Sequence, residues 1–248
     1  MKSAVTNAWL RPRPDALPDR QVLVGDGFRA IETRAGWVRG ETVKDAYAGW
    51  LPESALGAQI APTHWVSVRT TWGFEKPDFK SAPMIDLHMT SMLQCTLHDD
   101  AWLKMLHGDV QIFVPTAHCK AMDDRAENLV EVARAFLGVP YVWAGNTGFG
   151  LDCSGLVQTA MRAAGQDCPA DSHQQERMAG TKLANSDTLA LGDLIFWKGH
   201  VAIASGPTHI IHANAHHMMV VEEPVGMAID RISESDTGDV TSRLRPAR

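Results

Sequence analysis

The sequence predicts two small all-β barrels followed by an α+β domain, and two observations support this prediction. Short β-rich runs alternate with turn residues up to about residue 115, and six of the eight tryptophans lie in this part of the chain. Beyond residue 123 the pattern changes to two helical segments followed by short apolar runs. We therefore expect three domains, at residues 1–56, 57–122 and 123–248.

The N-terminal half shows no clear helical periodicity. Residues 20–56 (RQVLVGDGFRAIETRAGWVRGETVKDAYAGWLPESAL) and residues 64–115 both read as short strands separated by turns. In the first stretch the glycines are spaced as hairpin turns would be: Gly25, Gly27, Gly36, Gly40 and Gly49. Two barrels of roughly 50 to 60 residues each account for this spacing.

The C-terminal half predicts two helices and an antiparallel sheet. Residues 123–139 place apolar residues at helical spacing, with acids at the start and a glycine at the end. A second apolar face runs from Cys153 to Gly165. The runs 193–197, 200–205, 209–213 and 218–223 then read as strands, whereas the polar tail beyond Asp230 gives no comparable signal.

Composition narrows the class of protein. A net charge of −6 gives no electrostatic reason to expect nucleic acid or an anionic membrane as partner. No apolar run reaches the 18 residues of a membrane span, and residues 1–19 lack the apolar core of a secretory signal. The four cysteines include no C-x-x-C pair, so we expect reduced thiols, no structural zinc and no cofactor. Together these features favour a cytoplasmic protein.

The stretch LDCSG (residues 151–155) raises the possibility of a nucleophile. A nucleophilic cysteine must be a thiolate, which is favoured at a helix N-terminus and beside a histidine. Asp152 is a good N-cap, and it would place Cys153 in the first turn, where the helix dipole favours a negative sulfur. The Asp152 charge opposes this effect, so a histidine is required. From spacing alone, a packed, inert thiol remains the other interpretation.

Two histidines meet this requirement if the following strands form a hairpin. In GHVAIASGPTHIIHAN (residues 199–214) a turn centred on Gly206 would set His200 directly opposite His212 on one face. One imidazole would act as base and the other would orient it. With eleven histidines a chance pair is also an open alternative. A metal cluster with His209, His216 and His217 is disfavoured, because strand alternation turns His209 away from His212.

Several motifs together resemble the NlpC-type cell-wall cysteine peptidases. These are GVPYVWAGNTGFGLDCSGLVQTAMRAAG (residues 138–165), LGDLIFW, GHVAIAS and IIHA, in this order, over roughly residues 124–225. AYAGWLPESAL (residues 46–56) resembles the bacterial SH3-like barrels of a recycling subgroup in that family. The resemblance implies an α+β papain-like catalytic domain preceded by all-β SH3-like barrels.

The resemblance also implies roles for individual residues. Cys153 would be the nucleophile, His200 the general base and acid, His212 the orienting residue, and Tyr141 an oxyanion-hole donor. Substrate contacts would come from two residues beside the nucleophile, two in PADSHQQ and two in the first barrel: Asp152, Ser154, Asp171, Ser172, Asp26 and Tyr47. The sequence departs from the family at Ala144 and Ala202, which are often glycine there, and at His173, which replaces a serine.

The implied substrate is a peptidoglycan-derived peptide, L-Ala-γ-D-Glu linked to a diamino acid. It would be cut after γ-D-glutamate, and a free N-terminal alanine would be required, as in murein peptide recycling. The alternatives that remain open at this point are a broader cell-wall endopeptidase or an amidase or acyltransferase of the same superfamily, and a wall-binding SH3-like module with a vestigial catalytic domain. The diamino acid, the oligomeric state and the role of the second barrel are not predicted.

Overall fold

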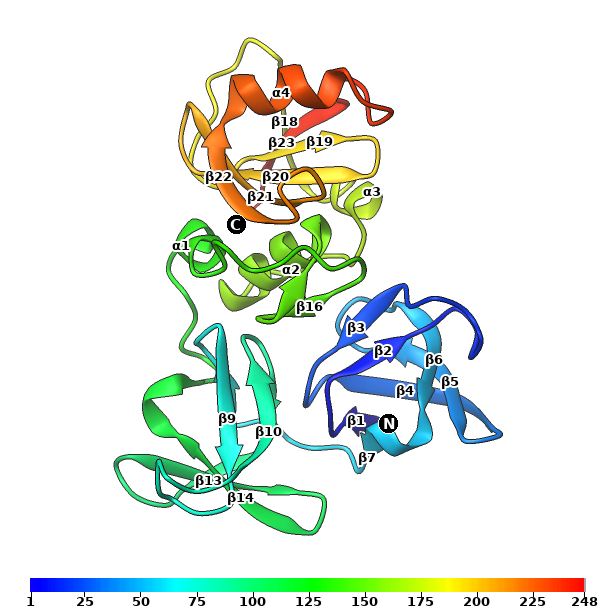
Figure 1. Ribbon diagram of the computed structural model, residues 1–248, viewed down its shortest axis with the longest axis vertical. Coiled ribbons are helices and arrows are strands. Elements are labelled where there is room, and N and C mark those ends of the chain that lie inside the picture. The colour runs from blue at the N-terminus through cyan, green and yellow to red at the C-terminus, as the bar shows by residue number, and fades with distance from the viewer. Residues whose placement is uncertain (248) are drawn as a thin grey trace. The chain divides into compact units, whose positions relative to one another are not determined.

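The computed structural model describes residues 1–247 and divides into two compact units (Figure 1). The first unit holds residues 1–125 with 146–148, and the second holds residues 126–145 with 149–248. The short segment 146–148 joins the first unit through hydrogen bonds, because Asn146 N–H donates to Gln21 Oε1 (3.0 Å) and Gly148 N–H to His88 Nδ1 (3.3 Å). The sequence predicted one continuous domain over residues 123–248, and the placement of segment 146–148 differs from this expectation.

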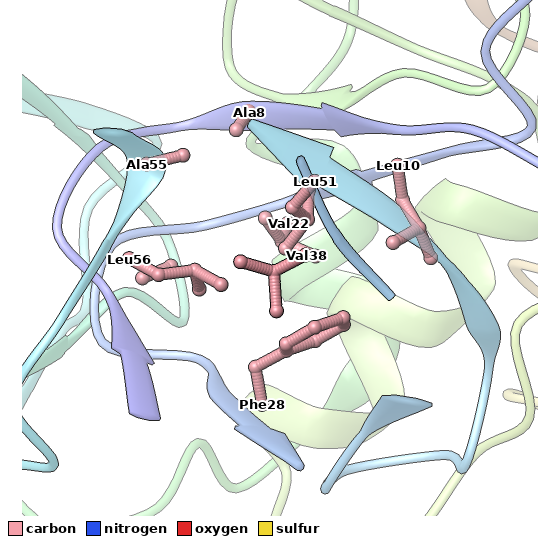
Figure 2. Close-up of a cluster of buried hydrophobic side chains, with 9 residues drawn as sticks. Ala8, Leu10, Val22, Phe28, Val38, Leu51, Ala55 and Leu56 are labelled. Atoms are coloured by element: carbon pink, nitrogen blue, oxygen red, sulfur yellow. The ribbon is translucent and has the colours of Figure 1, made fainter. Parts of the chain in front are cut away.

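The first barrel is built from seven short strands. Five form an antiparallel sheet in the order β6-β5-β4-β1-β7, and β2 pairs with β3. Their bounds are β1 (Lys2–Ala4), β2 (Ala8–Leu10), β3 (Arg20–Val22), β4 (Gly27–Arg34), β5 (Trp37–Thr42), β6 (Ala48–Pro52) and β7 (Leu56–Gly57). Phe28, Val38 and Leu51 meet in the buried cluster at its centre (Figure 2). Burying side chains of this size stabilises such a small barrel by about 1.5–3 kcal/mol each.

The glycines of this barrel do not all mark turns. Gly36 does, because Ala35 (φ 49°) and Gly36 (φ 77°) form the two-residue loop between β4 and β5. Gly40 and Gly49 instead lie inside β5 and β6, directly opposite each other. A Cβ at Gly40 would come within 2.3 Å of the Arg29 carbonyl oxygen, so close backbone approach requires glycine there. The hairpin-turn prediction for these two positions is wrong.

The second barrel repeats the plan of the first. Its sheets run β10-β9-β14-β13-β12 and β11-β8-β15. The strands are β8 (His64–Val66), β9 (Thr70–Phe74), β10 (Pro83–His88), β11 (Met92–Leu93), β12 (Cys95–Leu97), β13 (Trp102–His107), β14 (Val110–Pro115) and β15 (Cys119–Ala121). Near the end of each barrel, a strand finishes with a proline and is followed by one 3₁₀ turn, at Glu53–Ala55 in the first barrel and at Thr116–His118 in the second. The turn leads into a last short strand in both cases.

The second unit is an α+β domain. Its sheet has the order β18-β23-β19-β20-β21-β22 and is antiparallel, with α1 and α2 on one side and α4 on the other (Figure 1). Its elements are α1 (Leu129–Arg134), β17 (Gly150–Leu151), α2 (Cys153–Ala163), α3 (Ser172–Gln175), β18 (Gly180–Leu183), β19 (Leu194–Trp197), β20 (His200–Ala204), β21 (His209–Asn214), β22 (Met219–Pro224), α4 (Val225–Ser233) and β23 (Ser242–Pro246). The short strand β16 (Asn146–Thr147) belongs to the first unit.

Most of the elements expected in this domain are present, with two differences. The second helix and the four expected strands are confirmed as α2 and β19–β22. The first helix is shorter than predicted, because Asn128 caps it through a bond from Val130 N–H (2.9 Å) and the acidic residues 123–127 stay outside. α4 begins at Val225, before the polar tail, and its Ala228 packs on Ala202 and Ala204, whereas the tail itself contributes the inner strand β23. Across residues 1–247, no helix is long and apolar enough to cross a membrane.

Candidate active site

Cys153 is the first residue of α2, and Asp152 caps that helix as predicted. One carboxylate oxygen of Asp152 accepts the Gly155 N–H (2.7 Å) and the Ser154 hydroxyl (3.0 Å). The other accepts the Ala144 N–H (3.0 Å). The carboxylate therefore ties the loop before α2 to the helix start and holds Cys153 in place. Ala144 adopts a left-handed φ of 62°, a conformation that glycine adopts more readily than alanine.

The Cys153 thiol lies against the first residues of β20. Its Sγ is 4.0 Å from the Gly199 carbonyl oxygen, and the Val201 N–H also bonds to the sulfur, so the thiol contacts the backbone on both sides of His200. Burial, followed by the Asp152 charge, raises the pKa of the Cys153 thiol to about 12. The backbone N–H groups at the helix start lower this pKa but do not overcome burial. Activation therefore requires a base, as the sequence indicated.

His200 and His212 form a directly bonded pair, although not in the register expected. β20 and β21 pair Ile203 with Ile211, which places Ala202, not His200, opposite His212. The directly opposite arrangement is wrong by two residues, and an offset of two leaves both imidazoles on the same face. As diagonal neighbours, they approach until His200 Nε2 is 2.8 Å from His212 Nδ1.

Burial keeps both imidazoles neutral. His212 is 1% exposed, and the buried Trp197, opposite His200 in β19, packs its ring 5.5 Å from that of His200. Burial, together with the smaller effects of the neighbouring His212 and Arg231, lowers the pKa of His200 to about 3. Burial also lowers the pKa of His212, while Glu223 opposes this effect. A neutral imidazole has a free lone pair, so His200 is able to accept a proton.

Sequence reasoning missed two residues that continue this chain of contacts. Glu223 Oε1 lies 2.7 Å from His212 Nε2, and Arg231 of α4 binds the same carboxylate with two nitrogens. The sequence held a partial signal for Glu223, because strand alternation places it on the same face as Val221, two residues earlier in β22. Val221 pairs with His212, so Glu223 lies on the face of that histidine. Arg231 lies in the tail, where no element was predicted.

Tyr141 lies at the same site as His200. Both line a cavity of about 560 Å³, which is closed by the segment after β21 and by the end of α4. Burial, then the charges of Cys153 and Asp152, raises the pKa of the Tyr141 hydroxyl above its usual range. The hydroxyl is therefore a protonated hydrogen-bond donor close to the nucleophile. Its contribution to an oxyanion hole remains a prediction.

The other expected substrate contacts near α2 are engaged within the fold. Ser154 is buried, its hydroxyl donates to Asp152, and its carbonyl accepts from Gln175 Nε2 (3.0 Å) of α3. Asp171 is half-buried and caps α3 in a capping box with Gln174. Ser172 is the first residue of that helix. Substrate roles for Asp152, Ser154, Asp171 and Ser172 stay predictions.

Asp26 and Tyr47 lie in the first unit. Tyr47 is half-buried against the barrel core, and its N–H donates to Thr42 Oγ1 (3.0 Å). Asp26 is 2% exposed, accepts the Leu23 N–H (2.9 Å) and pairs with Lys44 Nζ (2.6 Å). Its carboxylate bonds within its own barrel. The substrate contacts expected of Asp26 and Tyr47 stay predictions. The Gly-Asp-Gly segment acts as a turn with a buried ion pair.

We expect Lys44→Ala to destabilise this barrel strongly. The Lys44 and Asp26 side chains are 7% and 2% exposed, and the substitution would leave a buried carboxylate without its cation. Losing one partner of a buried pair costs about 3–5 kcal/mol. Urea unfolding followed by tryptophan fluorescence measures the loss. Lys120→Ala breaks the exposed pair with Asp124 and should cost about 1 kcal/mol or less. Equal losses in the two variants would contradict the prediction.

The histidines outside the pair do not build a metal site. Within residues 1–247, His, Cys, Asp and Glu side chains form no group of three arranged to hold a metal ion. His209 lies at the exposed start of β21, and His217 bonds to Asn214 through its backbone N–H (2.8 Å). The four cysteines are free.

A buried thiol at the start of a helix, beside a bonded histidine pair on an antiparallel sheet, defines a papain-like cysteine peptidase. Residues 138–236 match the NlpC/P60 family, and residues 10–56 match the bacterial dipeptidyl-peptidase SH3 domain. The chain belongs to the NlpC/P60 family of cysteine peptidases. The fold class and enzyme class expected from the sequence are thereby confirmed.

Three relatives show how far the similarity extends. A gamma-D-glutamyl-L-lysine dipeptidyl-peptidase of Bacillus subtilis is 36% identical over 222 residues, which is 80% of this chain and 73% of that protein. A protein of the same name from Bacillus cereus is 28% identical over 232 residues, covering 79% and 67%. The crystal structure of an NlpC/P60 family protein from Bacillus cereus superposes with a TM-score of 0.81 over 98% of both chains, at 21% identity.

Proposed function

We propose that this chain hydrolyses the bond between γ-D-glutamate and a diamino acid in peptidoglycan-derived peptides that carry a free N-terminal L-alanine. The observation that carries the proposal is the Cys153 thiol held beside the His200–His212 pair, which suits attack on an amide carbonyl. The substrate class rests on the two relatives named gamma-D-glutamyl-L-lysine dipeptidyl-peptidase, which align with about four fifths of the chain.

The proposed mechanism begins with proton transfer from Cys153 to His200. The thiolate attacks the γ-glutamyl carbonyl carbon, and the developing oxyanion accepts from the Cys153 N–H and the Tyr141 hydroxyl. His200 then donates its proton to the leaving amine of the diamino acid. Water, deprotonated by His200, attacks the thioester and releases the dipeptide. His212 holds the His200 ring throughout.

We also propose how the free amine is recognised. Asp171 is half-buried near the start of α3, and its carboxylate suits a charge-assisted bond to an ammonium group. Acetylating the amine removes its charge and with it the charge-assisted bond to Asp171.

Hydrolysis assays on purified full-length protein test the function. L-Ala-γ-D-Glu-diaminopimelate and L-Ala-γ-D-Glu-Lys should both be assayed beside their N-acetylated forms. We expect cleavage of at least one free-amine peptide and a loss of roughly 10- to 100-fold in kcat/KM upon acetylation, because a hydrogen bond to a charged group contributes about 1.5–3 kcal/mol. Equal cleavage of both forms would refute amine recognition, and no cleavage of any of them would refute the substrate.

We propose that this turnover takes place in the cytoplasm. Four free thiols suit a reducing compartment. Cell fractionation with an antibody against the chain tests this, and recovery of the protein in the medium or at the wall would contradict it.

A further inference from the structure

Beyond the histidine pair, the hydrogen-bonded chain ends in an ion pair on the far side of His212. Glu223 Oε1 lies 2.7 Å from His212 Nε2 and also accepts from Arg231 Nη2 at 2.5 Å. Glu223 Oε2 accepts from Arg231 Nη1 at 2.8 Å. The Glu223 side chain is 11% exposed and that of Arg231 is 25% exposed, so water screens the pair only in part.

The ion pair determines where the protons of the two imidazoles lie. A guanidinium stays charged in proteins, and two bonds from it keep Glu223 ionised, so this carboxylate only accepts hydrogen bonds. His212 must therefore carry its proton on Nε2. Because His212 is neutral, its Nδ1 is a lone pair, and the proton in the 2.8 Å contact must come from His200 Nε2. The remaining nitrogen of His200, Nδ1, is then the free base.

We propose that Glu223, held by Arg231, is a positioning residue that sets the tautomers of His212 and His200 and so leaves His200 Nδ1 free to accept the Cys153 proton. The proposal rests on the proposed catalytic roles of Cys153 and His200. It extends the site from three residues to five and gives α4, which carries Arg231, a part in catalysis.

The same pair supports the imidazolium that forms during the reaction. When His200 takes the thiol proton, its positive charge can be shared along the chain toward the Glu223 carboxylate. Besides His200, which is bonded to it, the other titratable or charged groups with a clear effect on His212 are Arg231 and His217, and both disfavour a positive charge there. Glu223 opposes them, because its carboxylate favours a positive charge on His212.

Glu223→Gln is the direct test, with Glu222→Gln as its matched control. Glutamine keeps the shape but offers both a donor and an acceptor, so it no longer imposes one tautomer. We expect kcat on the γ-glutamyl peptide to fall about tenfold with KM within about twofold, because a charge-assisted bond is roughly twice as strong as a neutral one. Glu222 is the neighbour on β22 and pairs with Arg134 instead, so its variant should keep full activity.

Alkylation of Cys153 by iodoacetamide, located by mass spectrometry, gives a readout that needs no substrate. We expect it to slow by a similar factor in Glu223→Gln and to be unchanged in Glu222→Gln. If peptide cleavage fails in the wild type but this difference persists, the substrate proposal fails and the positioning role stands. If both variants match the wild type in alkylation and kcat, the positioning role is overturned.

The wild-type protein provides a test that does not depend on the folding of a variant. Imidazole 15N shifts distinguish a protonated from an unprotonated ring nitrogen. We expect protonated Nε2 and unprotonated Nδ1 in both His200 and His212. A protonated Nδ1 on either neutral ring would overturn the proposal.

Discussion

Replacing Cys153 by alanine is expected to lower kcat by about 10⁴- to 10⁶-fold, because removing a nucleophile abolishes the covalent route and leaves only binding and the oxyanion hole. The fold should be kept. The side chain is small, and Asp152 rather than Cys153 makes the bonds that start α2. Single-turnover assays with the γ-glutamyl peptide measure the loss, and circular dichroism reports on the fold.

Cys168→Ala is the matched control for this variant. Cys168 is also a buried thiol, 3% exposed, and it lies after α2 with its Sγ 3.5 Å from the Pro169 carbonyl oxygen. It should lose comparable packing and keep activity within a few-fold. If Cys153→Ala retained more than about a hundredth of wild-type kcat, the nucleophile assignment would be wrong.

Replacing His200 by alanine is expected to cost at least about 10⁴-fold in kcat at pH 7. The thiol pKa of about 12 means that, without a base, about one thiol in 10⁵ is ionised at this pH. A thiol with a raised pKa ionises only as the pH rises, and its thiolate fraction increases about tenfold per pH unit below the pKa. The residual rate should therefore increase about tenfold per pH unit between pH 7 and 10. The wild type, whose base accepts the proton, should vary far less over this range.

The pH profile separates a missing base from a damaged fold. His209→Ala is the control, because His209 is an exposed histidine at the start of the neighbouring strand β21. It should keep the wild-type rate and profile. A His200→Ala variant with a flat profile, or with near-normal activity at pH 7, would show that another group accepts the Cys153 proton.

Local sequence pattern was sufficient for the elements of the catalytic domain. The short apolar runs at 200–205 and 209–213 identified two strands, and the turn at residues 205–208 joined them correctly. It also put His200 and His212 on one face, because side-chain direction repeats every two residues and survives an offset of two. The register itself did not follow, since residues 205–208 allow more than one pairing of the flanking strands.

Contacts between elements distant in sequence had to come from the fold. Gly40 and Gly49 read as turns, but their role is close backbone approach, which depends on Arg29 of the next strand and on Leu10 of another. Asp26 was expected to contact substrate, and the sequence did not predict that Lys44 pairs with it from a different turn of the barrel. Neither partner is visible in the residues that flank these positions.

The chemistry of the site divides in the same way. The sequence predicted that Asp152 and Cys153 begin a helix, because capping acts over three residues. It also predicted the histidine pair, because both histidines lie on one hairpin. Glu223 and Arg231 were not, because their position depends on a third strand and on the docking of α4 against the sheet. Short-range geometry is encoded by neighbouring residues, whereas burial and charge pairing arise only when distant segments pack together.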